Sequence, residues 1–180
     1  HSPSIASDLH LDNIVLVDGG RGFPLRKGMT KLDNSDYSFL ERFLDSTKSN
    51  LFFARGVLIV EGDAENILMP VIARLLKRDF SEYGVSVINV GGVGLGRYAR
   101  IFMRADPESD GQISTPVACV TDLDVMPDCA PVIVGKIKAG EDIPTRPPSK
   151  RQWRVKSEFT ATELKERRQT RINKASGQNV

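Results

Sequence analysis

Three apolar runs, each followed by polar residues, dominate the middle of the chain. They cover residues 57–61, 85–90 and 116–121, and each has the length of one buried strand. The segments between them, residues 64–78 and 97–104, have the apolar spacing of helices. Strands that alternate with helices are typical of a parallel sheet with crossover connections. The pattern therefore predicts an α/β fold.

The flanking regions are less regular. Residues 11–18 predict a first strand and residues 36–44 a short helix, whereas the proline-rich residues 126–150 predict a loop that leads into a basic helical segment at 162–172. Five apolar residues of the helix at 64–78 have the spacing of a stripe that faces the core. They are Ile67, Leu68, Val71, Ile72 and Leu75.

Carboxylates follow the first and third apolar runs. Glu61 ends the first run and Glu65 lies one helical turn onward, with Asp63 between them. Asp122 and Asp124 follow the third run and lean to one side of an extended segment. Because the carboxyl ends of parallel strands meet at one edge, we expect one acidic crevice. Ligands that are all oxygen suit Mg²⁺ or Mn²⁺.

Each acidic group alone also has a structural explanation. Acids in the first turn of a helix interact favourably with the helix dipole, and Gly62 with Glu65 imitates a capping arrangement. Asp122 and Asp124 are common residue types in turns. The two groups at the ends of two strands nevertheless favour a functional interpretation.

Three linked motifs resemble a TOPRIM domain, the metal-binding module of type IA and II topoisomerases, DnaG-type primases and certain nucleases. The motifs are strand-Glu61-Gly-x-x-Glu65-helix, strand-glycine turn-helix, and strand-Asp122-x-Asp124. More narrowly, the chain resembles the OLD (overcoming lysogenization defect) family, ATP-dependent nucleases in which TOPRIM follows an ABC-type ATPase. The matching segments are 52–65, 89–98 and 121–125.

This resemblance implies a TOPRIM (Rossmann-like) parallel sheet flanked by helices, with a basic helical and loop extension. It implies an endonuclease that hydrolyses DNA phosphodiester bonds with two ions of Mg²⁺ or Mn²⁺, for which Ca²⁺ could substitute without turnover. Glu61, Glu65, Asp122 and Asp124 would be the catalytic metal ligands, and Asp63 an outer-sphere or second-metal ligand.

The chain start resembles the end of an ABC-type ATPase, because His1-Ser-Pro3 precedes an apolar strand as the switch histidine does there. We therefore expect residues 1–50 to be the tail of an ATPase domain, 51–130 the TOPRIM core and 131–180 a linker with a basic helical insertion. The partners would be an N-terminal ATPase domain and DNA. The sequence leaves open whether the chain also forms a homodimer. No phosphate-binding Gly-x-x-x-x-Gly-Lys-Ser/Thr loop occurs, so these residues should not hydrolyse ATP.

Charge is unevenly distributed, although the formal net charge is only +2 at pH 7. From Arg146 onward there are ten Lys and Arg against three Asp and Glu, and before it fifteen against twenty. A basic extension beside an acidic crevice suits a nucleic-acid enzyme, although a solvated charged helix would have the same composition. The candidate DNA contacts are Arg97, Lys136, Lys138, Arg167 and Arg168.

Two other functions remain open from the sequence alone. A haloacid-dehalogenase-type phosphatase also has Asp-x-Asp after an apolar strand and would use Asp122 as nucleophile, but Glu61 and Glu65 would then have no role. A non-catalytic metal- or DNA-binding module is the other alternative.

Several classes of protein are disfavoured. The glycine run 91–96 lacks the Gly-x-Gly-x-x-Gly register of dinucleotide-binding proteins. Cys119 and Cys129 lack the spacing of a zinc site or a disulfide framework. No apolar stretch is long enough to span a membrane, and no export signal precedes the chain's first strand, so the expected location is the cytoplasm.

Overall fold

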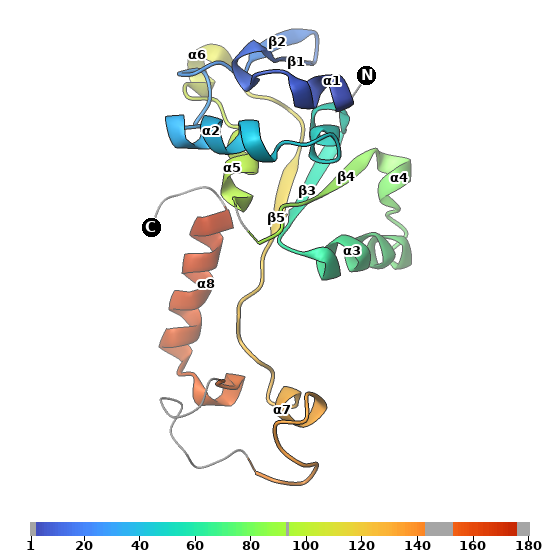
Figure 1. The fold of residues 1–180 in the computed structure, drawn as a ribbon, viewed down its shortest axis with the longest axis vertical. Coiled ribbons are helices and arrows are strands. Elements are labelled where there is room, and N and C mark those ends of the chain that lie inside the picture. Colours follow the sequence, from blue (N-terminus) through green and yellow to red (C-terminus); the bar gives the residue numbers. More distant parts are fainter. Residues whose placement is uncertain (1–2, 93, 143–152, 176–180) are drawn as a thin grey trace. The chain divides into compact units, whose positions relative to one another are not determined.

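The protein is described by a computed structural model that covers residues 3–92, 94–142 and 153–175 (Figure 1). It divides into two compact units, the first formed by His1–Thr121 with Asn173–Val180 and the second by Asp122–Ile172. His1, the predicted switch histidine of an ATPase domain, lies outside the described residues.

A three-stranded parallel sheet organises the first unit. Its strands are β3 (Gly56–Val60), β4 (Val85–Asn89) and β5 (Val117–Val120), in the order β4-β3-β5. The carboxyl ends of the strands are in register, because Val60 pairs with both Asn89 and Val120. The predicted α/β fold with a parallel sheet is confirmed.

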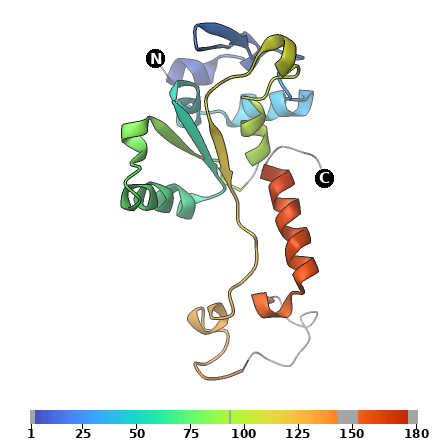
Figure 2. The ribbon, with the colours of Figure 1, turned by 180° about the vertical axis from the view of Figure 1, so that it is seen from behind.

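Helices lie on both sides of this sheet (Figures 1 and 2). On one side are α2 (Asn34–Phe43) and α5 (Leu95–Arg100), which contact each other, and α5 also contacts β3 and β5. On the other side are α3 (Asp63–Leu75) and α4 (Phe80–Tyr83), of which α3 contacts β4.

The first fifty residues build a separate antiparallel hairpin rather than a strand of the main sheet. Its strands are β1 (Val15–Asp18) and β2 (Arg21–Pro24), preceded by α1 (Pro3–Asp8) and the 3₁₀-helix η1 (Leu11–Asn13) and followed, after α2, by η2 (Lys48–Phe53). The predicted strand at 11–18 is therefore only partly right, because its first residues form a 3₁₀ turn.

A single hydrophobic core joins this hairpin to the sheet. Leu16 and Phe23 of the hairpin belong to the same buried cluster as Ile59 of β3 and Ile88 of β4. The β1–β2 hairpin therefore shares the buried core of the sheet.

The predicted core-facing stripe on α3 is wrong. The exposed fraction is 70% for Ile67 and 76% for Leu75, and only Ala73 of this helix is buried. The apolar spacing is real, but the sheet and α4 contact only a narrow part of the helix. Periodicity identifies an apolar face and does not say which surface covers it.

The described residues of the second unit form two short helical turns and most of a long helix, whose last residues, from Asn173, are counted with the first unit. They are α7 (Ala130–Ile133), the 3₁₀-helix η4 (Lys156–Glu158) and α8 (Ala161–Ala175). Arg154 makes two hydrogen bonds to the carboxylate of Glu163, of 2.7 and 2.8 Å, and so fixes the first turn of α8. In the described parts of both units, no helix is long and apolar enough to cross a membrane.

Candidate metal centre

The first acidic group lies where β3 passes into α3. Gly62 has an extended backbone and precedes the first helical residue, Asp63, so the helix begins two residues after Glu61. The backbone N–H of Gly62 donates to Oε2 of Glu65 over 3.0 Å. Glu65 therefore serves as a capping residue, as its structural explanation predicts. This bond uses only Oε2 of the carboxylate, so the other oxygen of Glu65 can still bind an ion.

The segment after β4 holds the first acidic group in place. Asn89, the last residue of β4, donates from Nδ2 to Oδ1 of Asp63 over 2.6 Å. Two residues further, the N–H of Gly91 donates to Oδ1 of Asn89 (2.9 Å), and the N–H of Gly92 donates to the backbone carbonyl of Glu61 (2.6 Å). The sequence analysis did not identify Asn89. Its position at the end of a strand could have indicated that it lies at the same edge of the sheet as the acidic residues.

The second acidic group follows β5. Val120, the last residue of β5, is the partner of Val60 in β3, and Asp122 comes two residues later. Asp122 and Asp124 are both exposed and belong to the second unit. Asp124 has a left-handed backbone with φ of 53° and forms an ion pair with Arg171 of α8.

The described carboxylates have the chemistry of a divalent metal site without forming a closed cage. Among the residues that the structure describes, no three His, Cys, Asp or Glu side chains lie close enough together to hold an ion. Carboxylates repel one another until a cation lies between them. All of these side chains offer carboxylate oxygens, which are the donors that Mg²⁺ and Mn²⁺ prefer. Arg171 forms an ion pair with Asp124, so an ion that binds Asp124 would have to displace this guanidinium or share the carboxylate with it.

Arg97, a candidate DNA contact, lies on α5 and already has partners. Its Nε lies 3.3 Å from Oδ1 of the buried Asp36, and its guanidinium carbon lies 4.4 Å from the centre of the Phe39 ring. Arg100 also binds Asp36, with Nη2 at 2.7 Å from Oδ1. The side chain of Arg97 is 34% exposed, so part of it still reaches the surface.

The other candidate DNA contacts lie in the second unit. Lys136, Lys138, Arg167 and Arg168 are all exposed. The guanidinium carbon of Arg167 lies 4.9 Å from the centre of the Phe159 ring, which is a cation–π contact.

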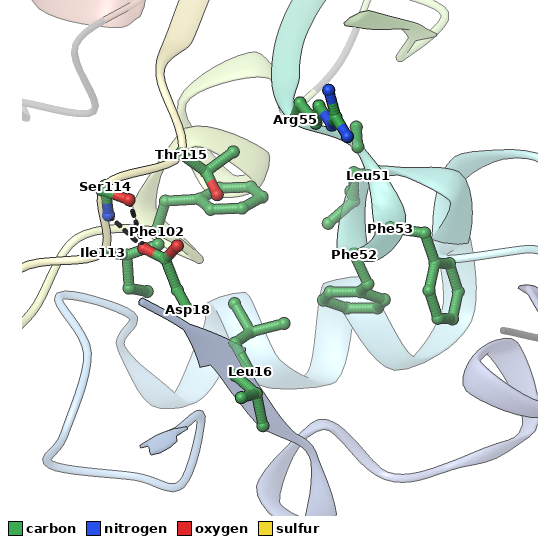
Figure 3. A pocket seen from close by; sticks show the side chains of 12 residues that line it. Leu16, Asp18, Leu51, Phe52, Phe53, Arg55, Phe102, Ile113, Ser114 and Thr115 are labelled. Atoms are coloured by element: carbon green, nitrogen blue, oxygen red, sulfur yellow. Dashed lines mark hydrogen bonds between the residues drawn. The ribbon is translucent and has the colours of Figure 1, made fainter. Parts of the chain in front are cut away.

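A separate cavity of about 330 Å³ lies at the amino ends of β3 and β5 (Figure 3). Phe52 and Phe102 line it together with two charged residues, Arg55 and Asp18. Oδ2 of Asp18 accepts hydrogen bonds from Oγ (2.7 Å) and N–H (2.5 Å) of Ser114, which lower the pKa of Asp18 below its ordinary value. Because the acidic residues follow the carboxyl ends of these strands, this cavity is no part of the candidate metal centre.

The chain also matches a known protein family. Residues 52–124 match the family model for the TOPRIM domain of overcoming lysogenization defect protein-like proteins. No curated protein matches the chain. The matched region contains both acidic groups, which favours the TOPRIM interpretation over a haloacid-dehalogenase-type phosphatase. TOPRIM domains bind divalent metal ions, typically Mg²⁺. Residues 52–124 of this chain are therefore an OLD-like TOPRIM domain, a metal-binding module of the nuclease and primase type.

Proposed function

We propose that this chain is the nuclease part of an ATP-dependent OLD-family protein and hydrolyses DNA phosphodiester bonds with divalent metal. The observation that carries the proposal is the parallel pairing of β3 with β5, in which Val60 is the partner of Val120. Two strands that are each followed by carboxylates thus end at the same edge of one sheet. A single strand with this motif would not support the same conclusion.

The proposed roles follow from the chemistry of each side chain. Glu61, Glu65, Asp122 and Asp124 bind the ions, and Asp63 binds at the margin of the site. When bound, a divalent ion activates water and neutralises charge on the reacting phosphate. The carboxylates keep the ions at the sheet edge, and the basic residues of α8 attract the DNA backbone. We expect Mg²⁺ or Mn²⁺ to support cleavage and Ca²⁺ to bind without it.

Nicking of supercoiled plasmid in the presence of Mn²⁺ tests this function. Glu61→Ala and Asp122→Ala should each reduce nicking to the background seen with chelator, because each removes an ion ligand. Glu82→Ala is the matched control, since Glu82 is an exposed acid of α4. Circular dichroism should show that all variants are folded. Equal nicking by the wild-type chain and both site variants would refute the assignment.

The alternative to this proposal is a non-catalytic module that binds metal and DNA. In that case the wild-type chain would bind DNA, and would bind Mn²⁺ in a way that depends on Glu61, but it would not nick the plasmid. Formation of an acyl-phosphate on Asp122 would instead support phosphatase chemistry.

A further inference from the structure

We infer that Asn89 is a positioning residue for the metal centre and acts through Asp63. This inference rests on the proposed metal-dependent function. Its basis is the 2.6 Å hydrogen bond from Nδ2 of Asn89 to Oδ1 of Asp63, which joins the end of β4 to the first residue of α3.

The orientation of the Asn89 amide follows from its two partners. The N–H of Gly91 can only donate, so it requires the amide oxygen of Asn89, to which it lies at 2.9 Å. A carboxylate can only accept, so Asp63 requires the amide nitrogen. Both partners demand the same orientation, and the side chain of Asn89 is therefore held from two directions.

The backbone around Asn89 is fixed in the same way. The N–H of Val90 donates to the carbonyl of Val60 over 3.0 Å, and the N–H of Gly92 donates to the carbonyl of Glu61 over 2.6 Å. Gly91 and Gly92 have φ of 63° and 82°, a left-handed conformation that favours glycine. This turn brings the chain back against the segment that carries Glu61 and Asp63.

Oδ1 of Asp63 accepts the hydrogen bond from Asn89. Because this bond fixes the orientation of the carboxylate, it also restricts the direction of the second oxygen before any ion binds. Asp63 is exposed and begins a helix, so without Asn89 its side chain would sample several rotamers. Partners that orient a ligand in this way typically change metal affinity by about 10–100-fold when they are removed.

Asn89→Ser is the variant that isolates this role. A serine hydroxyl can still accept from the N–H two residues on and so preserve the turn at Gly91. Its side chain is too short to reach Asp63 in place of the asparagine nitrogen. Asn50→Ser is the matched control, because Asn50 is an exposed residue of η2, which precedes the amino end of β3.

Calorimetric titration with MnCl₂ tests the inference in a double-mutant cycle with Asp63→Ala. We expect Asn89→Ser to weaken Mn²⁺ binding about 10-fold in the wild-type background and less than about twofold in the Asp63→Ala background. The thermal unfolding midpoint without metal should be unchanged by Asn89→Ser, and Asn50→Ser should bind like the wild type.

Two results would overturn the inference. One is unchanged affinity of Asn89→Ser, and the other is an equal loss of affinity in both backgrounds, which would indicate a role that does not pass through Asp63. If Mn²⁺ binding still depends on Glu61 in either case, the proposed function stands and only the role of Asn89 is lost. If the wild-type chain binds no Mn²⁺, both fail.

Discussion

A single residue in this protein can have a structural and a chemical role at the same time. Glu65 caps α3 through Gly62, as an acid in that position commonly does, yet only one of its two oxygens takes part in the bond. Asp63 is similar, because Asn89 binds one of its oxygens. A satisfied hydrogen bond therefore does not exclude either carboxylate from an ion site.

Asp18 provides a residue-level prediction for pH dependence. Hydrogen bonds from Ser114 lower its pKa below 3.8, so the folded state is favoured wherever the carboxylate is ionised. This contribution is complete above the pKa of the unfolded chain and is lost as the pH falls through the lower pKa of the folded state. We expect Asp18→Asn to reduce the free energy of unfolding by about 0.5 kcal/mol at pH 7, and by less at pH 3.

Urea denaturation of both proteins at the two pH values measures this difference. A gap between wild type and variant that is as large at pH 3 as at pH 7 would argue against a contribution from the ionised carboxylate.

At the scale of elements, α3 is the clearest departure from expectation. Its sequence has the periodicity of a buried amphipathic helix, whereas in the first unit its apolar residues are exposed. By contrast, the strand pattern was interpreted correctly, because Ile59 and Ile88 are buried on adjacent strands as their apolar runs predict. Strands of a parallel sheet are covered by helices on both faces and are therefore apolar throughout, whereas a helix on the surface of the sheet is covered on one face at most.

Substitutions on α3 should therefore be tolerated. We predict that Ile67→Glu and Leu75→Glu each change the free energy of unfolding by less than about 0.5 kcal/mol, because neither removes buried apolar area. Ile59→Ala, at a fully buried position of β3, should cost about 2–5 kcal/mol and is the comparison. Urea unfolding curves measure all three, and a large loss from either glutamate would mean that this face is covered in solution.

At the scale of the whole molecule, the distribution of charge separates two chemical tasks. The residues before Arg146 carry an excess of acids, including every proposed ion ligand, and the residues from Arg146 onward carry an excess of bases. An acidic surface alone would repel DNA, so the basic part is needed for binding if the chain acts on DNA.

This separation predicts how binding depends on salt. If Arg167 and Arg168 contact phosphates, each change to Gln should lower the slope of log affinity against log salt concentration by about one. Fluorescence anisotropy with a labelled duplex over a salt series measures the slope, and Arg42→Gln on α2 is the control. A slope that neither α8 variant alters would assign α8 a solvent-facing role without DNA contacts.

Much of the candidate site could be predicted because it is local in the sequence. Glu61, Asp63 and Glu65 lie within five residues of the end of a strand, and a strand-to-helix transition fixes their surroundings. Asn89 was missed because its hydrogen bond to Asp63 spans 26 residues, and the apolar periodicity of a strand does not indicate which side chain of a helix its last residue contacts. The partners of Arg97 were missed for the same reason, since Asp36 lies on a separate helix.

The sequence by itself determined the three strands of the parallel sheet and the family of residues 52–124, because apolar periodicity and closely spaced motifs depend on short-range geometry. Only the tertiary structure decided that the β1–β2 hairpin shares the core of the sheet, that α3 leaves its apolar face exposed, and that Asn89 holds Asp63. These outcomes depend on which distant surfaces meet when the chain packs, and a linear pattern of residues carries no record of that choice.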